Sequence, residues 1–112
     1  MANQHTEFSI SDKNQLLKLL HENVRALEYA SQELRADKEL VLCAVGQKGR
    51  ALKFASPQLC DDFDCVLAAV TQNGKALEYA SDELKSNLEI VTAAVKNNGS
   101  ALVFANDELK SN

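Results

Sequence analysis

A six-residue pattern that recurs every 25 residues constrains the fold of this chain more than any other feature. Its four copies begin at Ala26, Ala51, Ala76 and Ala101 and read ALEYAS, ALKFAS, ALEYAS and ALVFAN. A fixed period of this size is typical of stacked repeat proteins, in which each unit buries its apolar face against its neighbours. The sequence therefore predicts an all-α fold, a short α-solenoid of four 25-residue helical repeats.

The period divides the chain into an N-terminal leader, residues 1–11, and a single repeat domain, residues 12–112. The predicted units are residues 12–36, 37–61, 62–86 and 87–111. Each unit opens with a residue type favoured at helix N-caps, namely Asp12, Asp37, Asp62 or Asn87. In the last unit Ser86 and Glu89 also fit a capping box, which would start that helix one residue earlier.

Each unit is predicted to contain a long helix of about eleven residues, a glycine turn, a short helix and one further helical turn. Gly49, Gly74 and Gly99 follow the long helices and are expected to adopt the left-handed conformation. Val24 replaces this glycine in the first unit, so its helix is predicted to run on or to end differently. The further turn should carry one leucine inward in each unit: Leu34, Leu59, Leu84 or Leu109.

The long helices carry an apolar stripe that is wide for a surface helix. In the third unit, Val66, Ala69 and Val70 follow the i, i+3, i+4 spacing. A stripe of this width indicates a helix packed between two neighbours, and its alanines allow close approach of the helix axes. The first unit has bulkier residues, Leu16, Leu17, Leu19 and Leu20, as a terminal capping unit would.

Composition argues against several classes of partner. The chain has 12 Lys and Arg against 16 Asp and Glu, a net charge of −4, whereas nucleic-acid and acidic-membrane binding normally require a basic excess. No apolar run is long enough for membrane insertion, and no secretion signal is evident at the start. Three cysteines at irregular spacing predict reduced thiols in a cytoplasmic environment.

Residues typical of catalysis or metal binding are sparse. His5 and His21 have no implied acid or nucleophile as a partner, and the spacing of Cys60 and Cys65 differs from that of metal sites. The glycines stand alone, so no phosphate-binding loop is predicted. We therefore predict that the protein is not an enzyme and has no catalytic residues, no metal site and no cofactor.

The repeat resembles a known family. The pattern Asp-x-Glu-x-Val-x-x-Ala-Val-x-x-x-Gly-x-Ala-Leu-x-Tyr-Ala-Ser-x-x-Leu-Lys is similar to the tandem repeats called domain of unknown function 4116. It covers residues 37–111 well and residues 12–36 loosely. The family implies no activity, but it occurs in intracellular, amoeba-associated bacteria and in some protists. The resemblance implies an effector that acts in the cytoplasm, or in the host cytosol after secretion without a signal.

Positions on the predicted short helices form columns that run across the units. One column is basic, and the next alternates in charge, which would pair opposite charges between neighbouring units. The residues of these two columns are Arg25, Arg50 and Lys75, then Glu28, Lys53 and Glu78. A third column is aromatic: Tyr29, Phe54, Tyr79 and Phe104. The rings either line a peptide groove beside the cations or pack between units with each cation over a ring.

The favoured hypothesis is a non-enzymatic module that binds a protein or peptide through the six residues of the two charged columns. Val103 and Phe104 are candidates for self-association, which allows a homodimer through the C-terminal end. The alternative is a structural spacer or oligomerisation segment without a specific ligand. Nucleic-acid binding along Arg25, Arg50 and Lys75 is a third possibility that the net charge disfavours.

Overall fold

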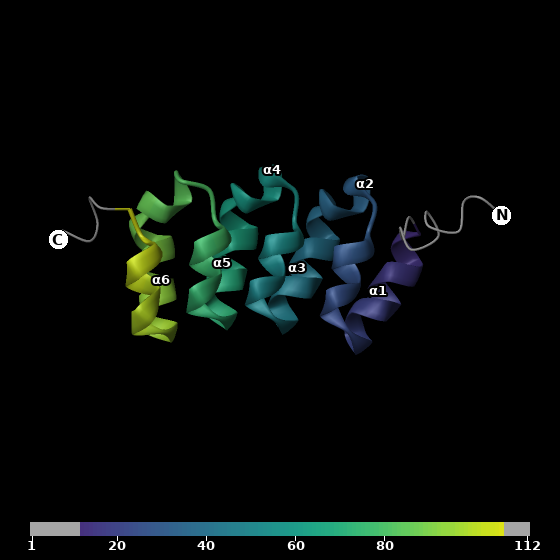
Figure 1. The fold of residues 1–112 in the computed structure, drawn as a ribbon, viewed down its shortest axis with the longest axis horizontal. Helices are drawn as coiled ribbons and strands as arrows, with labels where there is room; N and C mark the ends of the chain where they lie inside the picture. Colours follow the sequence, from purple (N-terminus) through teal and green to yellow (C-terminus); the bar gives the residue numbers. More distant parts are fainter. Residues whose placement is uncertain (1–11, 107–112) are drawn as a thin grey trace.

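The computed structural model describes residues 12–106, which form a row of helices with no β-strand among them (Figure 1). In chain order the elements are α1 (Lys13–Glu22), η2 (Val24–Tyr29), α2 (Gln32–Arg35), α3 (Lys38–Gln47), η3 (Gly49–Phe54), α4 (Pro57–Cys60), α5 (Phe63–Gln72), η4 (Gly74–Tyr79), η5 (Leu84–Ser86), α6 (Leu88–Asn97) and η6 (Gly99–Phe104), where η denotes a 3-10 helix. The all-α prediction is confirmed. We call the segments that start at Asp12, Asp37, Asp62 and Asn87 the first to fourth segments.

The predicted N-caps begin the long helices. The Asp37 carboxylate accepts a hydrogen bond from the Leu40 backbone N–H at 3.2 Å, and Asp12 and Asp62 cap their helices in the same way. In the fourth segment the Asn87 side chain accepts from the Ile90 N–H at 3.1 Å. Helix α6 therefore starts at Leu88, and the capping box at Ser86 does not form the helix start. Each long helix has ten residues.

The short helix predicted after each long helix is present in every segment, and it is a 3-10 helix of six residues. A 3-10 helix has three residues per turn and commonly connects longer elements. Side chains three residues apart therefore point in the same direction. In η3 this spacing buries Gly49 and Leu52, the first and fourth residues. It also aligns Arg50 with Lys53, and both of these residues are exposed.

The prediction of left-handed glycines is wrong, because no residue in the described part of the chain has a positive φ. Gly49 and Gly74 instead begin 3-10 helices that touch the next long helix. A Cβ atom on Gly49 would lie 2.2 Å from the carbonyl oxygen of Ala69, and one on Gly74 equally close to that of Ala94. Glycine is needed here so that the backbone of the following segment can approach.

Val24 does not extend the first helix, contrary to the prediction. Helix α1 ends at Glu22, at the same point of the repeat as α3, α5 and α6. Val24 differs from the glycines in having a side chain at the point of contact, so α1 and η2 cannot approach the second segment as closely. In Figure 1, α1 is inclined relative to the helices that follow it.

The apolar side chains form one continuous core along the row. The alanines of the long helices, Ala44, Ala69 and Ala94, are completely buried. Ser31, Ser56 and Ser81 each accept a hydrogen bond from a backbone N–H three residues on, and the turns that follow bury Leu34, Leu59 and Leu84 as predicted. Leu109 and the leader, residues 1–11, lie outside the described residues.

Backbone hydrogen bonds join the segments at one edge of the row. The Ser56 N–H donates to the Arg35 carbonyl at 3.0 Å and the Ser81 N–H to the Cys60 carbonyl at 2.9 Å. The Asn106 N–H repeats this bond at 3.1 Å, with the Lys85 carbonyl as acceptor. Neighbouring segments are therefore tied at the backbone as well as through the core.

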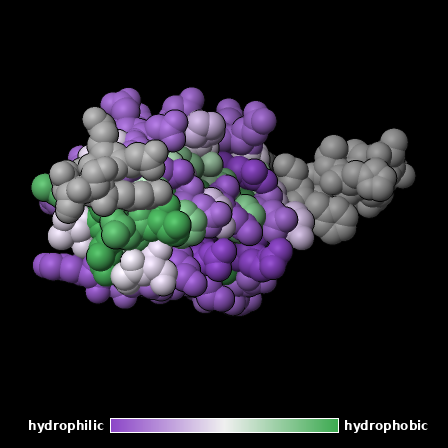
Figure 2. Space-filling view, turned by 60° about the vertical axis from the view of Figure 1, so that its left-hand side comes forward, coloured by the Kyte–Doolittle hydropathy of each residue, from purple (hydrophilic) through white to green (hydrophobic). Residues whose placement is uncertain are grey.

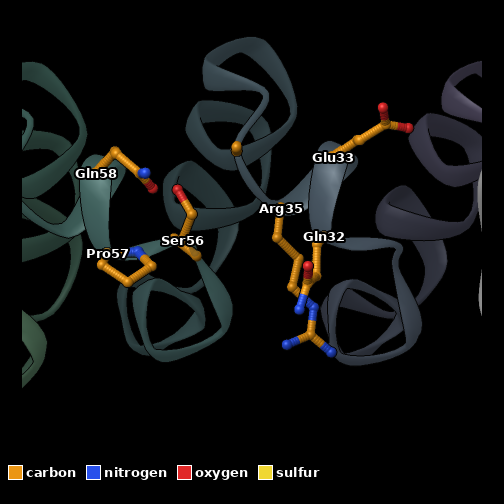
Figure 3. A pocket seen from close by; sticks show the side chains of 8 residues that line it. Gln32, Glu33, Arg35, Ser56, Pro57 and Gln58 are labelled. Carbon is orange, nitrogen blue, oxygen red and sulfur yellow. The ribbon is translucent and has the colours of Figure 1, made fainter.

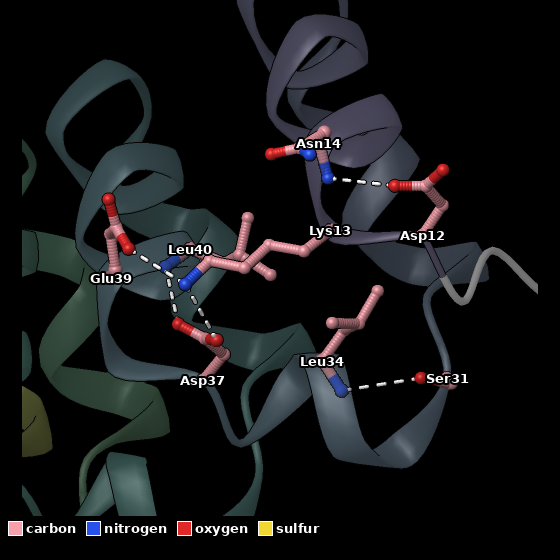
Figure 4. Close-up of polar contacts among 8 residues, drawn as sticks. All are labelled: Asp12, Lys13, Asn14, Ser31, Leu34, Asp37, Glu39 and Leu40. Atoms are coloured by element: carbon pink, nitrogen blue, oxygen red, sulfur yellow. Dashed lines mark hydrogen bonds and ion pairs between the residues drawn. The ribbon is translucent and has the colours of Figure 1, made fainter.

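Lysines at the start of the first two long helices make ion pairs with the next segment. The Lys13 ammonium lies 3.2 Å from Asp37 and 2.8 Å from Glu39 (Figure 4). Lys38 repeats the arrangement, 3.4 Å from Asp62 and 2.9 Å from Asp64. These pairs are exposed to solvent, so each stabilises the fold only weakly, but together they help to set the alignment of neighbouring segments.

Candidate functional site

A small cavity between η2 and η3 collects half of the charged residues that the sequence singled out. It has a volume of about 140 Å³, and its charged lining residues are Arg25, Lys48, Arg50 and Lys53. No carboxylate lines it, although the whole chain has a net charge of −4. We call this cavity the basic pocket.

Two neighbouring elements place these four cations. Arg25 is the second residue of η2 and Arg50 the second residue of η3, so stacking of the first two segments brings them to the same side. Lys48 is the C-cap of α3 and immediately precedes η3. Lys53 lies one 3-10 turn beyond Arg50 and therefore points the same way. Lys48 was not among the predicted site residues, because it belongs to no recurring column: its position is held by Asn23, Asn73 and Asn98 in the other segments.

Some of these cations have partners within the chain. The Arg25 guanidinium lies 3.2 Å from the Glu28 carboxylate, and the Arg25 side chain is 73% exposed. Arg50 donates a 3.4 Å hydrogen bond to the Tyr79 hydroxyl of the next segment. The Lys53 ammonium lies 5.0 Å from the centroid of the Phe54 ring. All three contacts are exposed and weak, so an anionic ligand can compete for the cations.

The predicted pairing of charges between segments is wrong for the described residues, because no ion pair joins Glu28, Lys53 and Glu78. The 3-10 geometry places Glu28 directly over Arg25 within η2, and the pair forms there. Lys75 and Glu78 lie on the exposed side of η4 and do not line the basic pocket.

The aromatic column lies at the border of the core. Tyr29 is half exposed, whereas Phe54, Tyr79 and Phe104 are partly buried against the core. The Arg50 guanidinium reaches Tyr79 of the next segment, but it bonds the hydroxyl group and does not lie over the face of the ring. Phe54, in contrast, lines the basic pocket, so this ring is also available to a ligand. Both interpretations of the column therefore stay predictions.

The C-terminal candidates lie in different surroundings. Val103 is highly exposed and occupies the same column as Glu28, Lys53 and Glu78, on the outside of η6. Phe104 is partly buried, as Phe54 and Tyr79 are. Its neighbour Leu102, which the sequence analysis did not single out, is 42% exposed, whereas Leu52 at the same position in η3 is 0% exposed.

A larger cavity of about 480 Å³ lies between α2 and α4, and Figure 3 shows the side chains that line it. Arg35 is the only cation of this cavity. Its guanidinium donates to backbone carbonyls, to that of Ala30 at 3.2 Å and to that of Glu28. The side chain of Glu33 points away from Arg35 and Gln32 (Figure 3). Because Arg35 already holds the chain of its own segment, this cavity offers less free charge than the basic pocket.

The three cysteines are free thiols. Burial, followed by the negative charge of nearby Asp62, raises the pKa of the Cys65 thiol to about 11. Burial also raises the pKa of Cys60. Raised pKa values are the opposite of what a nucleophilic cysteine requires. Among residues 12–106, no three His, Cys, Asp or Glu side chains lie close enough to hold a metal ion.

We expect the three thiols to react in an order set by burial. At neutral pH a thiol with a pKa of about 11 is ionised only in about one molecule in ten thousand, so Cys65 should react slowest with iodoacetamide and half-buried Cys43 fastest. Peptide mass spectrometry after timed labelling measures the order. Labelling in urea serves as the control, because unfolding should equalise the three rates. Equal rates in the native protein would show that Cys65 is not protected.

No helix in the described part of the chain combines the length and the apolar character that spanning a bilayer requires.

Comparison with known proteins gives one result. The family model described as "Domain of unknown function (DUF4116)" matches the chain twice in tandem, over residues 12–60 and 62–110. Each match spans two of the segments that begin with an N-capped long helix. No curated protein and no solved structure matches the chain significantly.

Proposed function

Because the chain belongs to the DUF4116 family of tandem repeats, we propose that it is a short α-solenoid of four 25-residue units that binds an acidic protein segment without catalysis. The long helices that begin at Lys13, Lys38, Phe63 and Leu88 support the 25-residue unit, since each is followed by the same 3-10 helix. The family description carries no activity. The function is therefore argued from the surface.

The observation that carries this proposal is the basic pocket. Four cations line it although acidic residues outnumber basic ones in the whole chain. Two of the four are arginines, whose planar guanidinium groups can bind carboxylates with two parallel hydrogen bonds. A partner segment rich in Asp or Glu would be attracted by the local positive potential and would compete with Glu28 for Arg25.

The size of the basic pocket favours a peptide over a metabolite. Cavities that enclose small molecules usually have volumes of about 300–1,000 Å³, and this one has about 140 Å³. It can therefore take one or two side chains of an extended segment, while the rest of the segment lies on the surface. Phe54 provides an apolar wall against which the stem of a Glu side chain can pack.

A structural spacer is the second candidate, because Arg50 already makes a contact between segments through Tyr79. For a spacer, the charges of the basic pocket would matter only for stability. Action in the cytoplasm or in a host cytosol stays a prediction that rests on the family resemblance.

Reversal of three of the four pocket charges should weaken binding without unfolding the protein. We expect the triple variant Arg25→Glu, Arg50→Glu and Lys53→Glu to bind a fluorescent decapeptide of Glu, Asp and Leu at least about tenfold more weakly than the wild type does. Fluorescence anisotropy at low and physiological salt measures the affinity, and circular dichroism checks the helices. All three residues are exposed on one side of the row, so the fold should survive.

The matched control is the variant Lys18→Glu, Lys75→Glu and Lys96→Glu, which makes the same change in net charge at exposed positions outside the basic pocket. It should bind the decapeptide nearly as well as the wild type. If both triple variants lost binding of the decapeptide equally, the effect would come from net charge alone, and the proposed role of the basic pocket would be wrong. Tighter binding of single-stranded RNA than of the peptide would favour the nucleic-acid alternative.

A further inference from the structure

The last segment leaves exposed several positions that the other segments bury. Leu27, Leu52 and Leu77 are 0% exposed, because the long helix of the next segment packs on each 3-10 helix. Leu102, at the same position of η6, is 42% exposed. Val95 is only partly buried, whereas Val45 and Val70 are completely buried. The end of the row is therefore apolar, and Figure 2 shows the hydrophobic patch there.

Gly99 is another exposed residue of this last segment. Its counterparts Gly49 and Gly74 touch the backbone carbonyls of the next long helix, and their N–H groups donate to side-chain carbonyls of that helix. The acceptors are Gln72 at 2.5 Å and Asn97 at 2.7 Å. A Cβ atom on Gly99 would meet nothing within 4 Å, and Gly99 is exposed. Within residues 12–106, η6 thus begins with the same glycine as η3 and η4, but no following long helix packs against it.

The opposite end of the row does not have the complementary surface. Gln15 and Lys18 are exposed on α1, at positions where the later long helices have buried or half-buried apolar residues. Leu19 takes the place of the completely buried alanines. A polar outer face is typical of a terminal unit. A second copy of this chain would therefore place a polar, bulky helix against Gly99, which makes a poor fit.

We infer that the end formed by Val95, Gly99 and Leu102, here called the stacking face, docks a further unit of the same repeat carried by a partner protein. The joints at Gly49 and Gly74 define the chemistry of that partner. It presents a helix whose backbone carbonyl, at an alanine, meets Gly99. Three residues later the helix has a Gln or Asn whose side chain accepts the Gly99 N–H, as Gln72 and Asn97 do at the two earlier joints. This inference does not depend on the basic pocket.

The probe for this surface is a full-length variant whose first helix has the pattern of an internal one. It carries Gln15→Leu, Lys18→Ala, Leu19→Ala and Glu22→Gln. It also carries Leu102→Glu, so that its own stacking face is blocked. We expect sedimentation velocity to show a 1:1 complex of this probe with the wild-type chain and no self-association of either alone.

Matched glycine variants test the geometry of the complex. Gly99→Ala in the wild-type partner should weaken the complex on the order of 100-fold, because the added methyl group meets the incoming carbonyl. Gly46→Ala should leave it unchanged, since a Cβ on Gly46 also meets nothing within 4 Å but lies on the exposed side of α3. A probe with native helicity and melting that forms no complex would overturn the inference. Self-association of the wild type that Gly99→Ala abolishes would also overturn it, because the occupant would then be a second copy.

A chain with an additional pair of segments tests the same surface if the probe fails to fold. Residues 62–111 are repeated after Ser111, which keeps the 25-residue spacing. Gly99→Ala in the first copy should then lower the urea midpoint of the extended chain as much as Gly74→Ala in the first copy does. The same Gly99→Ala change should leave the urea midpoint of the original chain unaffected. If Gly99→Ala changed the urea midpoint of both chains equally little, no repeat would pack on the stacking face and the inference would be wrong.

Discussion

Substitution of Gly74 by alanine is expected to lower the free energy of unfolding by ~3 kcal/mol or more. The added Cβ would lie 2.2 Å from the carbonyl oxygen of Ala94, and this oxygen belongs to the backbone of α6. A backbone atom cannot move aside as the end of a side chain can, so the third and fourth segments must separate. Separation would also stretch the 2.7 Å hydrogen bond from Gly74 to Asn97. Urea unfolding followed by circular dichroism measures the loss.

Two other glycines provide the controls. Gly99 begins η6 as Gly74 begins η4, but a Cβ there meets no atom within 4 Å, so Gly99→Ala isolates the intrinsic effect of alanine at this position. Gly46 lies inside α3 with open space around it, and Gly46→Ala should stabilise by up to about 1 kcal/mol through helix propensity. If Gly74→Ala changed stability no more than Gly99→Ala, close approach would not be the reason for the glycine.

The role of these glycines could not be predicted from the sequence, although their positions could. Glycine after a helix is compatible with a left-handed turn and with close backbone contact, and both explain the 25-residue recurrence equally well. The choice depends on how the segments stack, which is a property of residues about twenty apart. The N-caps such as Asp37 and Asn87 were predicted correctly because their hydrogen bonds involve residues only three apart.

In the candidate site, too, the positions of residues could be predicted from the sequence, but their contacts could not. The sequence identified Arg25, Arg50 and Lys53 as charged positions, and the structure places all three in one pocket. The predicted pairing of Lys53 with Glu28 and Glu78 was wrong. Side chains three residues apart line up in a 3-10 helix, so Glu28 pairs with Arg25 of its own segment. Lys48 escaped notice because it breaks the repeat, and a search for recurring columns passes over such a residue. Departures from the repeat were therefore as informative as the repeat itself.

Leu52→Ala should be among the most damaging of the simple core truncations, with a loss of about 2–5 kcal/mol in the free energy of unfolding. Leu52 is 0% exposed in η3, and the third segment packs against this helix, so truncation leaves a cavity at a joint between two segments. The Gly49 N–H donates to the Gln72 side-chain oxygen of the next segment, and this bond limits collapse into the cavity. Urea midpoints of the wild type and the variant measure the loss.

Leu102→Ala is the matched comparison, because Leu102 has the same place in η6 and 42% of it is exposed. Its loss should stay below about 1 kcal/mol, since much of the side chain already contacts water and little cavity forms. The difference between the two leucines measures how much a following segment contributes to the core of the one before it. Equal losses would mean that Leu102 is covered in solution, and the stacking face would then not be free to receive a partner.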